Sequence, residues 1–149
     1  MEIKIRSFEH EGVAPVDCPR RASAGSAAVD LQAAIAEPLV LEPGGALYKV
    51  PVGFGVELPE GTVGLVFARS GLGVKHGIAL SNGVGVIDSD YRGEIMVGLC
   101  NLSNEPYTVQ PLDRIAQFAV LNLPDVSYRF ADELSQTGRG EGGFGSSGR

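Results

Sequence analysis

The sequence contains no tryptophan, only two cysteines and no apolar run long enough to cross a membrane. Aromatic residues make up 7% of the 149 residues, whereas glycine occurs 21 times, a composition that favours many turns over long helices. Twelve basic residues stand against 18 acidic ones, and the net charge of −6 argues against binding a nucleic acid polymer. No basic segment precedes an apolar one at the N-terminus, so we expect neither secretion nor membrane insertion, and a cytoplasmic location.

A chain of 149 residues is long enough for one domain with a substantial core. Cys18 and Cys100 lack the spacing of a metal site, and we expect both thiols to stay reduced. The acidic net charge is still compatible with one small polyanion, held by a few arginines and a divalent metal ion. We therefore expect the function to reside in a local site.

Short strand-like segments separated by turn signals make up most of the chain. The first alternates polar and apolar residues, which predicts a half-buried strand, and the later ones are apolar on both phases, which suits a sandwich core or a subunit interface. Together they predict an all-β sandwich or barrel with at most one short helix. The predicted strands cover residues 1–8, 46–58, 62–68, 94–102, 107–109 and 114–121.

One short helix is predicted directly after residues 62–68, with Ser70 as its N-cap and Gly77 at its end. Helix N-termini present unpaired amides and a positive dipole end to anions. Arg69 adds a planar guanidinium suited to phosphate oxygens. The alternative is an ordinary capped turn beside a surface arginine.

The stretch 82–95 predicts a hairpin, with a strand at 84–87, a turn at 88–90 and a returning strand at 91–95. Two glycines in its first half remove side chains that a strand would normally carry. Such glycines often mark a place where a ligand or another backbone comes close. The stretch therefore predicts a small-molecule pocket built from main chain, with a polar surface hairpin as the alternative.

Two polar residues stand in apolar surroundings. Asp30 lies in the middle of 26–34, and Gln117 lies within 114–121. A turn or cap is the common role for such an aspartate, and a backbone partner is the common role for a buried amide. For Gln117, the alternative is that it faces a polar ligand.

The C-terminal residues 136–149 are glycine-rich and too poor in apolar residues to hold themselves against the domain formed by 1–135. We expect this arm to be mobile in the free chain, since ordering it costs about 1 to 2 kcal/mol per residue. It carries Arg139 and Ser146 for phosphate oxygens and Phe144 for stacking. These residues predict a flexible arm that closes over a ligand.

Five segments, in this order, closely resemble the sequence motifs of the trimeric dUTPases. Any one of them alone is a weak signal, but all five occur in sequence and span residues 28–148. Ala28 departs from the family pattern, because many relatives carry glycine there. The segments are residues 28–33, 69–73, 82–93, 114–117 and 139–148.

The resemblance implies a jelly-roll-like fold that forms a homotrimer, with sites shared between subunits and closed by a third chain's arm. It implies Mg²⁺-dependent hydrolysis of dUTP to dUMP and pyrophosphate, which limits uracil in DNA and supplies dUMP for dTMP synthesis. Asp88 would position and activate the attacking water and hold the sugar 3′-hydroxyl, since an aspartate is ionised at neutral pH. Asp90 is expected to act only within the turn.

The same resemblance assigns the substrate contacts. Tyr91 would lie against the deoxyribose and exclude a ribose 2′-hydroxyl. Mg²⁺ would be held chiefly by triphosphate oxygens and waters, with Asp30 acting through water at most. Uracil would contact Asn82, the backbone around Val86 and Ile87, and Met96. The phosphates would contact Arg69, Ser70, Gly71 and Gln117 and, in the arm, Arg139, Gly145 and Ser146, with Phe144 stacked on the base.

Two other functions fit the same fold. A dCTP deaminase would need a glutamate base beside the pyrimidine, where this chain has Asp88. Release of ammonia from dCTP, without pyrophosphate from dUTP, would identify that enzyme. A catalytically silent nucleotide-binding protein would bind dUTP and leave it uncleaved in Mg²⁺.

Overall fold

The computed structural model describes residues 1–143, which form eleven strands and one short helix. This confirms the predicted all-β class. No helix of the described part is long and apolar enough to cross a membrane. The strands are β1 Lys4–Ser7, β2 Val29–Gln32, β3 Leu39–Leu41, β4 Leu47–Pro51, β5 Phe54–Glu57, β6 Thr62–Ala68, β7 Ile78–Leu80, β8 Gly85–Ile87, β9 Met96–Asn101, β10 Tyr107–Val109 and β11 Arg114–Asn122, and the helix is α1 Ser70–His76.

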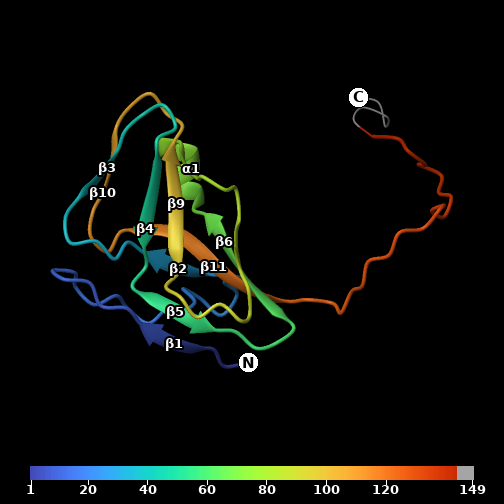
Figure 1. Cartoon of the computed structure of the whole chain (residues 1–149). Helices are drawn as coiled ribbons and strands as arrows, with labels where there is room; N and C mark the ends of the chain where they lie inside the picture. The colour runs from blue at the N-terminus through green and yellow to red at the C-terminus, as the bar shows by residue number, and fades with distance from the viewer. Residues whose placement is uncertain (144–149) are drawn as a thin grey trace.

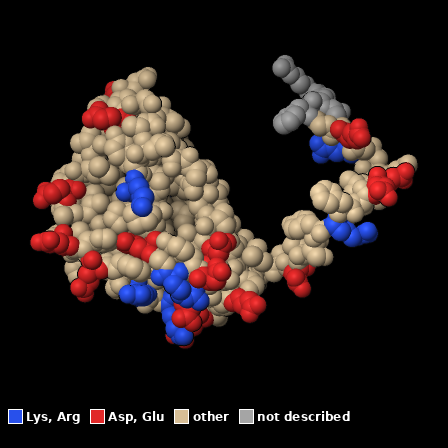
Figure 2. Space-filling view, in the orientation of Figure 1, with Lys and Arg blue, Asp and Glu red and all other residues tan. Residues whose placement is uncertain are grey.

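The strands form two larger antiparallel sheets and two strand pairs. The four-stranded sheet has the order β2-β11-β6-β8, and the three-stranded sheet has the order β4-β9-β7. Figure 1 shows β4 and β9 crossing steeply over β2 and β11, with the β1–β5 pair below them. Figure 2 shows that basic and acidic side chains mix around this lower end of the visible face.

Apolar side chains from both sheets form one core. Val97, Leu99 and Cys100 of β9 are buried, so this strand is covered on both faces, as its sequence predicts. Each fully buried aliphatic side chain contributes about 1.5 to 3 kcal/mol. Cys100 therefore packs as a core residue, whereas Cys18 is exposed, and both thiols are free. The largest fully buried side chains are Leu31, Leu41, Val50, Val52, Ile78, Ile95, Val97, Leu99, Asn101, Val109 and Ile115.

The first strand lies within the predicted segment 1–8, where Ile3 and Phe8 are partly buried, but the strand residues themselves are more exposed than predicted. All residues of Lys4–Ser7 are exposed, including Ile5. The reason is its position, because β1 pairs only with β5 at the edge of the fold.

The predicted hairpin at 82–95 does not form. β8 pairs with β6, and the segment 91–95 forms no strand. Its backbone bonds go elsewhere: the Ile95 amide donates to the Phe54 carbonyl, and the Val52 amide donates to the Ile95 carbonyl. The bend between β4 and β5 therefore takes the pairing that the hairpin would have used.

The helix begins after Arg69, which is its N-cap in place of the predicted Ser70. The Arg69 carbonyl accepts bonds from the amides of Leu72 and Gly73, and no side chain caps this end. Arg69 is extended because it continues β6 and its side chain is bonded elsewhere. Gly77 ends the helix with a left-handed φ of 68°, as predicted.

After β11 the chain leaves the folded body. The Leu123 amide still donates to the Gly61 carbonyl, but residues 124–143 extend away, as the orange to red segment in Figure 1 shows. Val126, Tyr128 and Phe130 expose 57%, 94% and 107% of their surface. Apolar side chains this exposed are typical of surfaces that another chain covers.

Candidate active site

Four residues predicted to bind uracil line one recess between the two sheets. Its cavity volume is about 120 Å³. Sites that hold whole drug-sized ligands measure about 300 to 1,000 Å³, so this recess suits a single ring. β8 forms one wall and β9 the other, and the predicted residues in it are Asn82, Val86, Ile87 and Met96.

Two glycines near this recess are required by the backbone conformation and by strand packing. Gly83 has a φ of 72°, a conformation that L side chains rarely adopt. A Cβ on Gly85 would lie 3.0 Å from Cβ of Val66 on β6. Close strand packing thus explains Gly85, which lines the recess and keeps its wall thin, and a tight turn explains Gly83.

Asp88 follows β8 and lies at the rim of a wider hollow of about 580 Å³, together with Ser89 and Asp90. The turn is internally bonded, since Arg92 donates to the Ser89 carbonyl at 2.6 Å and the Tyr91 amide donates to the Asp88 carbonyl at 3.2 Å. Within residues 1–143, the exposed Asp88 carboxylate has no hydrogen-bond or ion-pair partner. It is therefore available to a substrate or a water molecule.

The Tyr91 ring folds back over its own turn. Its hydroxyl donates to the Glu94 carbonyl at 2.9 Å. A Cβ on Gly93 would collide with the Tyr91 hydroxyl, so only glycine allows this arrangement. The ring remains partly exposed beside Asp88, where it can contact a ligand.

A second group of predicted residues gathers around Asp30 on β2. Arg69 Nε donates to Asp30 Oδ1 at 2.9 Å, and Arg114 Nη1 donates to Asp30 Oδ2 at 3.1 Å. Arg69 also donates to the Arg114 carbonyl at 3.0 Å. Gln117 lies opposite Asp30 in the β2–β11 register. We call these four residues the arginine cluster, and its two guanidiniums are suited to phosphate oxygens.

Tyr107 borders the arginine cluster in a pocket of about 150 Å³ that Arg69 and Arg114 also line. Burial raises the pKa of Tyr107, the Asp113 carboxylate adds to the rise, and Arg69 opposes it. The phenol is thus protonated at neutral pH and can donate a hydrogen bond. Ser70 and Gly71 open α1 directly after Arg69.

Within a single chain, Asp88 and the arginine cluster lie far apart. The register of β6 with β8 pairs Gly64 with Ile87, so Asp88 lies beside Val63, whereas Arg69 follows the other end of β6. At about 3.3 Å per residue, these ends are roughly 20 Å apart along the strand. Asp30 lies on β2, three strand spacings from β8 in the same sheet, which adds a separation of about 14 Å across the strands at 4.8 Å per spacing.

Arg139, the one predicted arm residue that the structure describes, lies outside both groups. Arg139 donates to the Gly142 carbonyl at 2.8 Å, and the Gly140 amide donates to Thr137, so these bonds stay within the arm. Phe144, Gly145 and Ser146 fall outside the described residues.

Among the described residues, no three His, Cys, Asp or Glu side chains gather to hold a metal ion. Both oxygens of Asp30 accept bonds from guanidiniums, while the exposed Asp88 carboxylate has no partner in the described part of the chain. This arrangement fits Mg²⁺ that arrives on a triphosphate and takes most of its ligands from phosphates and water.

Two residues that the structure connects to these groups had no role predicted from the sequence. Arg114 completes the arginine cluster. The sequence feature that could have indicated this role is its position three residues before Gln117. The Glu94 carbonyl accepts a hydrogen bond from the Tyr91 hydroxyl. The sequence feature that could have indicated this role is a charged residue directly before the buried Ile95.

The fold is that of solved dUTPase structures. A Staphylococcus bacteriophage 80alpha dUTPase mutant with dUpNHpp matches with a TM-score of 0.81 over 99% of both chains, at 24% sequence identity. A mutant dUTPase from phage phi11 of S. aureus, described as coordinating a structural Mg(II) ion, matches with a TM-score of 0.75. That match covers 89% of this chain and 98% of the other, at 23% identity.

Sequence comparison defines the family. The dUTPase family model matches residues 14–148. A deoxyuridine 5′-triphosphate nucleotidohydrolase of Desulfitobacterium hafniense is 53% identical over 131 residues, covering 87% of this chain and 86% of the relative. One of Alcanivorax borkumensis is 44% identical, covering 100% and 99%. The chain therefore belongs to the dUTPase family.

Proposed function

We propose that this protein hydrolyses dUTP to dUMP and pyrophosphate in the cytoplasm, which limits uracil in DNA and supplies dUMP for dTMP synthesis. The observation that carries the proposal is the Asp88 carboxylate, which has no partner within residues 1–143 and lies beside a recess sized for one ring. The names of the relatives at 44 to 53% identity support the same activity.

In the proposed mechanism, Asp88 orients a water molecule against the α-phosphorus and accepts its proton. A bond forms between the water oxygen and the α-phosphorus, and the bond from that phosphorus to the bridging oxygen breaks. Pyrophosphate leaves with the bonding electrons. Bound Mg²⁺ would neutralise charge on the phosphates, and the guanidiniums of the arginine cluster would hold their oxygens.

Substrate selection is proposed to reside in the recess and in Tyr91. The thin wall at Gly85 brings the backbone near Val86 and Ile87 within reach of the base. Fixed backbone donors and acceptors can reject cytosine, and close backbone can exclude the thymine methyl group. The Tyr91 ring, fixed through its hydroxyl, would lie against the deoxyribose and exclude a 2′-hydroxyl.

We further propose that each site is shared between subunits of a homotrimer. The triphosphate would extend from the recess past Asp88, and this chain's own Arg69 is at the opposite end of β6. A second subunit can supply its arginine cluster where the first subunit lacks one. The exposed apolar residues between Val126 and Phe130 are suited to cover by a neighbouring chain.

The activity is tested by measuring pyrophosphate release from dUTP, UTP, dTTP and dCTP, each with and without Mg²⁺. We expect dUTP to be cleaved at least 100-fold faster than the others, since a site built around polar substrate groups rejects analogues by large factors. Removal of Mg²⁺ by a chelator should strongly reduce this rate. Ammonia from dCTP, or bound but uncleaved dUTP, would refute the proposal.

Site sharing is tested by mixing two inactive variants, Asp88→Asn and Arg69→Ala. After co-refolding at equal amounts, about one quarter of the sites in random trimers would combine an intact Asp88 with an intact Arg69. We therefore expect about one quarter of wild-type activity in the mixture, measured as pyrophosphate release.

Each variant refolded alone is the control and should stay inactive. The double variant Asp88→Asn/Arg69→Ala mixed with either single variant should also show no recovery, because no site then has both groups. If the two single variants remain inactive after mixing, although mixed trimers are detected by mass spectrometry, the site is not shared.

A further inference from the structure

Glu94 uses both its backbone and its side chain close to the Tyr91 turn. Its carbonyl accepts the Tyr91 hydroxyl at 2.9 Å. Its carboxylate is only 12% exposed, and Oε1 accepts the Gly53 amide at 2.7 Å. A largely buried carboxylate with such bonds fixes the backbone that carries it.

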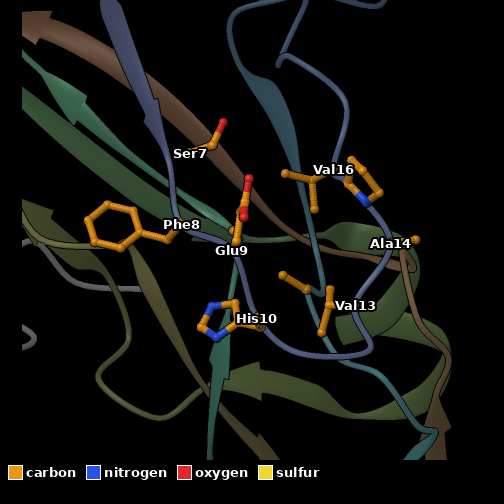
Figure 3. A pocket seen from close by; sticks show the side chains of 10 residues that line it. Ser7, Phe8, Glu9, His10, Val13, Ala14 and Val16 are labelled. Carbon is orange, nitrogen blue, oxygen red and sulfur yellow. The ribbon is translucent and has the colours of Figure 1, made fainter.

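His10 provides the other partner of this carboxylate. Its Nε2 lies 2.9 Å and 3.0 Å from the two Glu94 oxygens and donates to them. His10 belongs to the loop after β1, where it lines a pocket of about 250 Å³ with Val13 and Val16 (Figure 3). The N-terminal loop is thereby joined to the Tyr91 turn.

Gly53 is shaped for this contact. It has a φ of 76°, and a Cβ there would lie 3.0 Å from Val16 and 3.2 Å from Ala34. The next residue is held by the same bend, because the Ile95 amide donates to the Phe54 carbonyl. The Gly53 amide is therefore a fixed donor on the rigid bend between β4 and β5.

We infer that Glu94 is a positioning residue that sets the selectivity for deoxyribose over ribose. The inference rests on the proposed function and deepens it. His10 and Gly53 hold the Glu94 carboxylate, the carboxylate fixes its own carbonyl, and the carbonyl holds the Tyr91 phenol. Without this chain of contacts, the Tyr91 ring can move and leave room for a 2′-hydroxyl.

The test is the ratio of kcat/KM for dUTP to kcat/KM for UTP in Glu94→Ala. We expect this ratio to fall about tenfold or more, through a higher KM for dUTP and a smaller change in kcat, since the lost contacts bind the sugar. Glu94→Gln should restore most of the ratio, because its amide oxygen can accept the Gly53 amide. Glu57→Ala is the matched control, since it removes an exposed glutamate of β5 that pairs only with Lys4 of β1 among the described residues.

Calorimetric binding of dUMP and UMP gives a second readout that needs no hydrolysis, and we expect the same loss of discrimination. If Glu94→Ala does not fold, His10→Ala decides, since it removes one exposed partner and should lower the ratio several-fold. An unchanged ratio in the folded variant overturns the inference. A wild-type protein that binds dUMP selectively but does not cleave dUTP would refute the proposed function alone.

Discussion

Replacing Asp88 by asparagine should leave dUTP binding within about twofold and reduce kcat by roughly 10²- to 10⁴-fold, the usual contribution of a positioned general base. Asparagine keeps the shape of the side chain but cannot take the proton from the attacking water. The internal bonds of the turn, from Arg92 and the Tyr91 amide, go to carbonyls and survive the change. Single-turnover pyrophosphate release and calorimetric titration with a non-hydrolysable dUTP analogue separate the two effects.

Asp90→Asn is the matched control, because Asp90 is a second exposed carboxylate in the same hollow. It should retain most of the wild-type kcat. Two results would remove Asp88 from its proposed role: unimpaired hydrolysis by Asp88→Asn, or equal losses in the two variants.

Deleting the chain from Thr137 onward should leave the assembly folded and reduce kcat/KM for dUTP by about 100-fold or more, the scale on which loss of a closing lid is felt. The bonds described for Arg139 and Gly140 lie within the arm, so losing them takes no contact from the folded body. Sedimentation would report the assembly, thermal unfolding its stability, and pyrophosphate release its activity.

Arg139→Ala in the full-length chain is the comparison that separates one charge from the whole arm, and it should lose less activity than the deletion does. If the truncated chain unfolds, or if it keeps full activity, the arm is not a lid that acts on a preformed body.

The sequence predicted correctly those strands and helix ends that depend on only a few neighbouring residues. The strand Thr62–Ala68 and the helix end at Gly77 occur as predicted, because an apolar run and a left-handed glycine act over a few residues. The hairpin at 82–95 failed because alternation and turn residues do not tell which strand becomes the partner. Here the partners are β6 and the bend near Phe54, both distant in sequence.

In the candidate site, too, contacts between residues close in sequence were predicted and contacts between distant residues were not. Asn82 and Met96 were predicted together and share one recess. The contact of Arg69 with Asp30, and its effect on where α1 begins, depends on a pairing across 39 residues that spacing does not report. Glu94 was missed because its partners, His10 and Gly53, come from two other parts of the chain.

The ion pairs at Asp30 also bear on how a triphosphate would approach. The two guanidiniums there face the Asp30 carboxylate and the Asp113 carboxylate that lines the same pocket, on a chain whose net charge is −6. At physiological salt the screening length is about 8 Å, so the guanidiniums attract an anion only at close range. Long-range steering then contributes little to the capture rate, and discrimination among nucleotides is left to fit after contact.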